Sequence, residues 1–258
     1  MRVLALLATF LFAPLARATL IYLDSNLVTI HDEVTRAGAK YRLSNTNFDQ
    51  SLDNGAGTAN SKNFNRLNLG TVSQLSGSTY DFQLSHRSGQ GFLWSMTNVA
   101  NGLTSVLGWG TFPIPITGGI LDIDPLLNRI APNRPFNGVA IEARGIGAGG
   151  RMVVSNLTFS SPFAVADGTL ANIDVSQGSL TRRILASGDL SKTNWTLSGR
   201  VRAFKNTPGG DENVKLTLFV KQYDATFAQP VPEPWTFATV GAALAILLWR
   251  RKRSRAPA

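Results

Sequence analysis

The strongest constraint on the fold is a period of two in hydrophobicity. Apolar and polar side chains alternate along three segments, Tyr80–Leu84, Trp195–Ala203 and Val214–Val220. Such alternation is typical of half-buried β-strands, because successive side chains point to opposite faces of a sheet. Long amphipathic helical patterns are absent from the sequence, which is rich in Gly, Asn, Ser and Thr and poor in Glu. We therefore predict an all-β fold.

Further short strands are expected at regular intervals along the chain. They are Tyr22–Ile30, Phe64–Val72, Gly91–Thr97, Phe112–Ile123, Gly138–Ala143 and Met152–Phe159. Many short strands separated by turns indicate an antiparallel β-sandwich, and we expect one of jelly-roll type within a single domain over residues 19–228. Pro208, Gly209 and Gly210 lie between the last two alternating segments, so we predict that these two strands form an antiparallel hairpin.

Two segments are predicted to be loops. Asp49–Asn63 is polar and rich in Gly and Asn, which favours a flexible surface loop. Residues 131–137 contain two prolines and mark a second break. Neither segment has the length of a domain linker, which supports the single domain.

The basic charge of the chain is concentrated at its ends. The formal net charge is +9, but seven of the 25 basic residues and one of the 16 acidic ones lie in the terminal segments, which leaves 18 basic residues against 15 acidic ones. A nearly neutral centre without a basic stripe argues against nucleic-acid binding. The chain has no cysteine, so disulfides, thiolate metal sites and a cysteine nucleophile are excluded.

The N-terminal segment has the three parts of a secretory signal peptide. Arg2 supplies the positive charge, Val3–Ala13 is apolar, and Ala16 and Ala18 form an A-x-A cleavage pattern before Thr19. The apolar run is too short to span a bilayer core of about 30 Å as a helix. We expect residues 1–18 to direct export through the Sec translocon and to be removed by signal peptidase.

The C-terminal segment, residues 229–258, combines three features. Pro232, Glu233 and Pro234 form a stiff, accessible tripeptide, since proline restricts its own backbone and that of the preceding residue. Trp235–Trp249 is uncharged, has an indole at each end and would rise about 22 Å as a helix, which makes a marginal membrane anchor. A basic tail follows, with Arg250, Arg251, Lys252, Arg253 and Arg255. These charges are expected to stay on the cytoplasmic side of the inner membrane.

This combination resembles the PEP-CTERM protein-sorting signal of Gram-negative bacteria. The resemblance covers about the last 28 residues: residues 232–234 match the tripeptide, residues 235–249 the transmembrane helix and residues 250–255 the basic cluster. It implies recognition by an exosortase, an integral-membrane enzyme that resembles a cysteine protease or transpeptidase. It also implies an association with exopolysaccharide and biofilm formation. An ordinary C-terminal anchor is the alternative.

A G-x-G-x-x-G pattern occurs at Gly145, Gly147 and Gly150. A dinucleotide site needs a helix N-terminus after such a loop, to hold the pyrophosphate. The following residues, Arg151–Phe159, have a strand pattern instead. We interpret this segment as a glycine hairpin turn.

The titratable residues give no catalytic motif. The only histidines are His31 and His86; His86 is expected to be a surface imidazole, and His31 lacks a second imidazole at zinc-ligand spacing. Asp122 and Asp124, or the segment Asp167–Asp174, could supply oxygen ligands to calcium. Isolated aspartates in loops are more often turn formers, so we predict no metal and no cofactor.

Carbohydrate binding would use exposed aromatic rings, for which the candidates are Trp94, Trp109 and Trp195. Trp195 continues the inward set of its strand and is expected in the core. Trp109, between two glycines, is the best candidate for stacking on a sugar ring, with core packing as the alternative.

Two functions follow from these observations. The first is a non-catalytic structural or binding protein, secreted, sorted to the cell surface or extracellular matrix and associated with exopolysaccharide. The alternative is a polysaccharide-active enzyme or carbohydrate-binding module on the β-sandwich. An enzyme would need a carboxylate pair, and the glutamates of the predicted domain are Glu33, Glu142 and Glu212, which the sequence does not pair.

Overall fold

A computed structural model gives the fold of the chain. It describes residues 19–23, 29–44, 47–53, 64–110, 135–162, 164–167, 170–206 and 213–226. The described strands belong to a compact unit that ends at Ala225, apart from the last residue of the final strand; a second unit covers Thr226–Ala258. Within the described part of the chain, no helix is long and apolar enough to cross a membrane.

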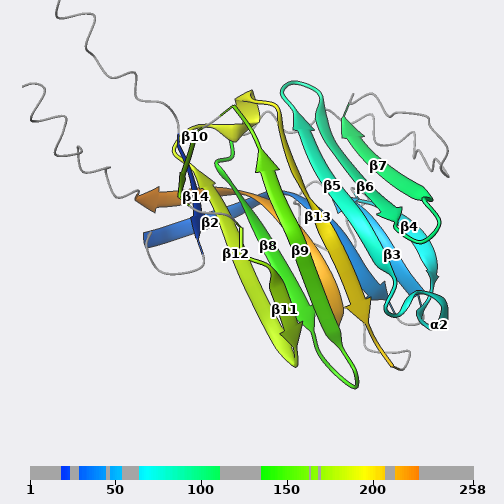
Figure 1. Cartoon of the computed structure of the whole chain (residues 1–258). Coiled ribbons are helices and arrows are strands. Elements are labelled where there is room, and N and C mark those ends of the chain that lie inside the picture. The colour runs from blue at the N-terminus through cyan, green and yellow to red at the C-terminus, as the bar shows by residue number, and fades with distance from the viewer. Residues whose placement is uncertain are drawn as a thin grey trace, which may run out of the picture. The chain divides into compact units, whose positions relative to one another are not determined.

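The described residues form two β-sheets (Figure 1). The larger one, sheet A, has eight strands in the order β10-β1-β12-β8-β14-β2-β3-β4. Their bounds are β10 Ala164–Asp167, β1 Thr19–Leu23, β12 Gly178–Ala186, β8 Gly138–Gly145, β14 Val214–Thr226, β2 Thr29–Ser44, β3 Asn47–Asp53 and β4 Phe64–Thr71. Strand β1 pairs in parallel with β10 and antiparallel with β12.

The smaller one, sheet B, has six strands in the order β11-β9-β13-β5-β6-β7. Their bounds are β11 Ile173–Ser176, β9 Arg151–Ser160, β13 Trp195–Phe204, β5 Thr79–Arg87, β6 Gly91–Asn98 and β7 Thr104–Gly110. All of its strand pairs are antiparallel. The helical elements described are short, α2 at Val72–Leu75 and the 3-10 helix η2 at Leu190–Lys192.

The hydrophobic core contains side chains from both sheets. On β14 the residues Val214, Leu216, Leu218 and Val220 are fully buried, and so are their alternating counterparts Leu84 of β5 and Leu197 of β13. The predicted period of two is thus confirmed, because alternate apolar side chains of these strands are buried in the core; on β14 the other side carries Lys215, the buried Thr217 and Phe219. The all-β sandwich is confirmed with it.

Most of the predicted strands correspond to observed ones. The segments predicted around residues 64–72, 91–97, 138–143 and 152–159 are β4, β6, β8 and β9. Strand β12 was missed, because Arg182 and Arg183 are adjacent and interrupt the alternation. The strand predicted at Phe112–Ile123 lies outside the described residues.

The predicted hairpin between the last two strands is wrong. Strand β13 pairs with β9 and β5 in sheet B, whereas β14 pairs with β8 in sheet A. Each strand has one apolar side, and in opposite sheets the two apolar sides bury each other across the core. The nine residues that join them are longer than a usual hairpin loop of two to five residues, and they allow the chain to cross between the sheets.

The predicted flexible loop at Asp49–Asn63 is wrong for its first part. Residues 49–53 belong to β3, and Asp49, Gln50, Ser51 and Leu52 are buried. Strand β3 lies between β2 and β4, so its backbone groups are paired on both sides although its side chains are mostly polar. Residues 54–63 lie outside the described part.

Candidate functional site

The outer face of sheet B, which points away from the core, carries mainly hydroxyl and amide side chains. It is formed by alternate residues of β9, β13, β5 and β6, which the strand register aligns in rows. One row runs across the sheet through Thr158, Ser198, Gln83 and Ser95. A second row runs through Ser160, Thr196 and Ser85. The alternation on β5 and β13 predicts which side chains point outward, but not that four strands align them.

Two grooves lie on this face. The first has a volume of about 290 Å³ and is lined by Asp81, Phe82, Gln83, Ser95, Thr97, Asn156, Ser198 and Gly199. The second has a volume of about 440 Å³ and is lined by Gln83, Ser85, His86, Arg87, Ser160, Ser161, Pro162, Asn194, Trp195 and Thr196. Because Gln83 lines both, the two grooves meet at the middle of β5. We call them together the sheet-B groove.

The hydroxyl and amide groups in the sheet-B groove hydrogen-bond to one another. The Gln83 amide donates to Ser85 Oγ at 2.8 Å, and Ser85 Oγ lies 3.2 Å from Thr196 Oγ1. Thr158 Oγ1 and Ser198 Oγ are 3.1 Å apart. The first contact lies within β5 and the other two join neighbouring strands; together they orient the side chains before any ligand arrives.

An exposed ion pair borders the first groove. The Arg200 guanidinium donates two hydrogen bonds to the Asp81 carboxylate, at 2.7 and 3.1 Å, from directly opposite positions on β13 and β5. The two side chains are 42% and 52% exposed. The bidentate contact neutralises the carboxylate and fixes its orientation.

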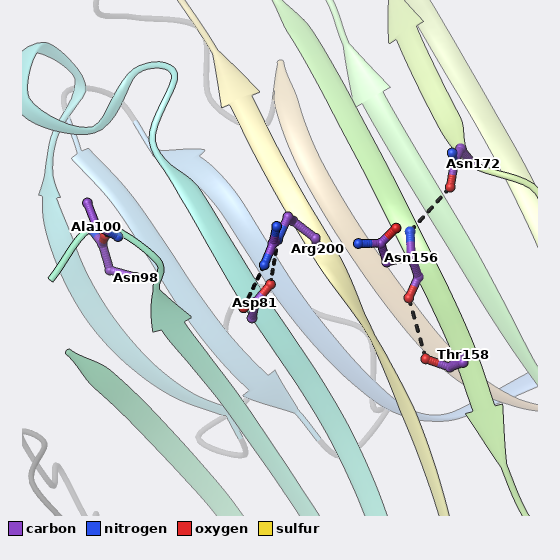
Figure 2. A network of polar contacts seen from close by, with 7 residues as sticks. All are labelled: Asp81, Asn98, Ala100, Asn156, Thr158, Asn172 and Arg200. Carbon is purple, nitrogen blue, oxygen red and sulfur yellow. Dashed lines mark hydrogen bonds and ion pairs between the residues drawn. The ribbon is translucent and has the colours of Figure 1, made fainter. Parts of the chain in front are cut away.

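Asn156 occupies a β-bulge beside this ion pair. Strand β9 places Asn156 and Leu157 opposite the single residue Gly199 of β13, and Asn156 has a positive φ of 54°. A side chain at position 199 would collide with the Phe82 ring, since its Cβ would lie 2.8 Å away, so glycine allows the strands to pack at the bulge. The Asn156 backbone N–H donates to Asn172 Oδ1 at 3.2 Å, and its carbonyl accepts from Thr158 Oγ1 at 3.4 Å. Figure 2 shows the Asn156 side chain projecting toward Arg200 of the neighbouring strand.

His86 is not the surface imidazole that we predicted. It is 4% exposed and its ring packs against Phe92, Phe136 and Trp195, with centroid distances of 4.8, 5.1 and 5.6 Å. His86 lies on the inward side of β5, in register with the core residues Trp195 and Phe92. Burial lowers its pKa, although the contact of Nδ1 with the Thr193 carbonyl at 2.9 Å and the charge of Asp189 act in the opposite direction.

The tryptophans that the structure describes lie in the core. Trp94 is 0% and Trp195 2% exposed, which confirms the core position of Trp195. Trp109, the candidate for sugar stacking, belongs to β7, but its side chain lies outside the described part. Phe82, His86 and Trp195 are among the residues that line the sheet-B groove, but each is at most 4% exposed, so its other lining side chains, which are mainly polar, make up most of its exposed surface.

Several described carboxylates are engaged by cations or by backbone donors. Glu142 lies 3.4 Å from Lys215, and Asp174 receives hydrogen bonds from Arg151. Asp189 caps η2 by accepting from Ser191; burial would raise the Asp189 pKa, but the hydrogen bonds lower it below its ordinary value. Among the described residues no group of three metal-ligating side chains is found. Asp122, Asp124 and Glu212 lie outside the described residues, as does the side chain of Glu33.

The glycine segment at residues 145–150 joins two strands and not a strand to a helix, as predicted. However, β8 belongs to sheet A and β9 to sheet B, so the turn crosses between the sheets and is no paired hairpin. Gly147 and Gly149 have φ values of 82° and 67°, a region that favours glycine. The Ile146 N–H also donates to the carbonyl of Asn213, the residue before β14. This hydrogen bond connects the turn between β8 and β9 to the start of β14.

The residues of the two predicted terminal signals lie outside the described part. These are the cleavage residues Ala16 and Ala18, the tripeptide 232–234, the predicted helix 235–249 and the basic tail. Comparison with known protein families gave no match for this chain, and comparison with curated proteins found no relative.

Proposed function

We propose that this chain is a secreted protein that an exosortase sorts to the cell surface or extracellular matrix of a Gram-negative bacterium. There the β-sandwich serves a non-catalytic structural or binding role in exopolysaccharide and biofilm. Its partners are the Sec translocon and signal peptidase, then the inner membrane and the exosortase, and finally the exopolysaccharide. Before processing it is a membrane protein, held by residues 235–249.

The position of the last strand carries this proposal. Strand β14 lies between β8 and β2 in sheet A and ends at Thr226. The tripeptide begins at Pro232, so cleavage there would remove the anchor and leave all the described strands in place. A domain that is complete before the cleavage point can be released folded.

The jelly-roll type is the finer part of the fold proposal. The chain passes from one sheet to the other between β4 and β5 and then on every step from β7 to β14. Repeated crossings of this kind support a jelly-roll over an up-and-down arrangement.

The carbohydrate-binding alternative is supported by a separate observation, the polar sheet-B groove. Shallow faces of hydroxyl and amide groups can hydrogen-bond a hydroxylated polymer. The enzymatic alternative would use two carboxylates across a cleft, and Asp81, which lines the first groove, is already held by Arg200. We therefore favour binding over catalysis.

The sorting proposal is tested by the mass and location of the protein in intact cells. In wild-type cells we expect loss of the tail near residue 231 and arrival at the surface or in the medium. In exosortase-deficient cells, and for the Pro232→Ala, Glu233→Ala, Pro234→Ala triple variant, we expect full-length protein in the membrane. If full-length protein stayed in the membrane of wild-type cells, the tail would be an ordinary membrane anchor, and the proposal would be contradicted.

A further inference from the structure

The sheet-B groove has the length of several sugar residues. Its lining runs along β5 from Asp81 to Arg87, and six steps of a β-strand span about 20 Å. Cross-strand neighbours on β13 and β9 form its other side over the same length. A groove that is long, shallow and open is suited to an extended chain and not to a compact small molecule.

The lining has little net charge. Asp81 and Arg87, the charged residues of the lining, carry opposite charges at its two ends, and Asp81 forms an ion pair with Arg200 beside the groove. His86 also lines the groove, and burial lowers its pKa and so disfavours its charged form. A polyanion would gain no counter-charge in the middle of this groove, so charge complementarity favours an uncharged ligand.

The side chains in the middle of the groove retain hydrogen-bonding capacity. A hydroxyl can donate once and accept twice, so Thr196 and Ser198, which are partly exposed, each keep free positions after their cross-strand contacts. Outward residues on one strand recur every 6 to 7 Å, which gives a periodic array of donors and acceptors. A polymer of neutral sugars presents hydroxyls that both donate and accept at regular intervals.

Asn156 is the residue with the strongest indication of a role. Its left-handed backbone is uncommon for a residue with a side chain, and such conformations often occur at functional positions. Asn172 and Thr158 bond its backbone, whereas its exposed side-chain amide has no bond to the other described residues. The bulge thus places a side-chain donor and a side-chain acceptor at the first groove, both available to a ligand.

We infer that the sheet-B groove binds a single chain of an uncharged polysaccharide, which lies along β5 and β13 and is anchored by the Asn156 side-chain amide. This inference rests on the proposed exopolysaccharide association, since it names the class of polymer and the surface that would hold it. Binding is by hydrogen bonds and not by ring stacking on the described face.

The test is affinity electrophoresis of the protein purified from its producing cells. The probes are the neutral and the acidic fractions of the exopolysaccharide that these cells release, separated by anion exchange. We expect the neutral fraction to retard the protein and the acidic fraction to have little effect. Absence of retardation by the neutral fraction, or stronger retardation by the acidic one, would overturn the inference.

Two variants locate the site. Asn156→Gly keeps a residue that tolerates positive φ and removes only the side chain, and Gln83→Ala alters the junction of the two grooves. Each should weaken retardation about fivefold, as expected for loss of one hydrogen bond, with unchanged circular dichroism. Ser179→Ala, an exposed hydroxyl on β12 of sheet A, is the matched control and should bind as wild type. Wild-type binding by Asn156→Gly would remove the anchor role and contradict the assigned site.

Sorting and binding can fail separately. The triple-alanine variant of residues 232–234 should still bind the neutral fraction, because the sheet-B groove lies in the sandwich. If the tail is processed and the neutral fraction does not bind, the inference fails and the sorting proposal stands. If the protein binds the neutral fraction but the full-length chain stays in the membrane, the sorting proposal fails and the binding result stands.

Discussion

Ion pairs on the outer faces of the two sheets differ sharply in burial. On sheet A, Arg42 and Asp49 lie 3.1 Å apart with side chains only 17% and 1% exposed. On sheet B, Arg200 and Asp81 lie 2.7 Å apart with side chains 42% and 52% exposed. Both pairs join directly opposite residues of neighbouring antiparallel strands. The same chemistry therefore lies in two different dielectric environments.

The difference in burial predicts different roles for the two ion pairs. The buried pair contributes to the stability of the fold, whereas the exposed pair is accessible to a ligand. A buried pair loses most of its hydration, so removal of one partner leaves a charge that little solvent can stabilise. An exposed pair keeps its water, and its net contribution to stability is small. We expect sheet A to respond to charge removal mainly through folding, and sheet B mainly through ligand binding.

The largest effect is expected for Asp49→Asn. This variant removes the charge that Arg42 Nε contacts at 3.1 Å in a buried position, and the free energy of unfolding should fall by about 3 kcal/mol. Urea denaturation followed by circular dichroism measures this change. If the free energy of unfolding fell no more than it does when an exposed pair is removed, the burial of Asp49 would not determine how much this ion pair contributes to stability.

An intermediate effect is expected beneath the face of sheet B, from the protonation of His86. Burial holds its folded-state pKa below the ordinary value of about 6.5, so the unfolded chain binds the proton more tightly. The folded state is therefore most stable relative to the unfolded state above about pH 6.5. This stability decreases as the pH falls toward the folded-state pKa of His86. Thermal unfolding between pH 7.5 and 5 should show this loss.

The control for this pH dependence is His86→Phe, which should flatten the profile over that range. His31→Gln should leave it unchanged, since the effect is assigned to the ring that contacts Phe92, Phe136 and Trp195. A profile unaltered by His86→Phe would assign the acid sensitivity to other groups.

The smallest effect on stability is expected for Asp81→Asn. Because both partners of this pair are about half exposed, the variant should unfold within experimental error of wild type, in contrast to Asp49→Asn. The same urea series measures it, with Arg200→Met as the second half of a double-mutant cycle. A coupling energy as large as that of the Arg42 and Asp49 pair would remove the distinction between the two faces.

Local patterns predicted much of the fold. Strands β5, β13 and β14 follow from alternating side chains, because a pleated strand that is buried on one side requires that period. Trp195 was placed in the core for the same reason. The terminal signals are also local, since short contiguous motifs carry them, and they stay predictions outside the described residues.

The tertiary structure decided those features of the fold that depend on residues far apart in the sequence. Whether β13 and β14 pair or face each other across the core depends on the burial of two apolar sides, which alternation within either strand cannot reveal. The burial of Asp49 in a polar segment depends on strands at both of its sides, and that of His86 on Phe136, which is 50 residues away.

The candidate site shows the same division. The sequence by itself determined that polar side chains alternate along single strands, and it predicts a sorting signal at each end of the chain. Only the tertiary structure aligned Gln83, Ser198 and Asn156 from three strands and set the bulge that presents the Asn156 amide. The physical reason is that strand register and bulges are fixed by packing between strands far apart in the chain, and a linear pattern carries no information about which strands will meet.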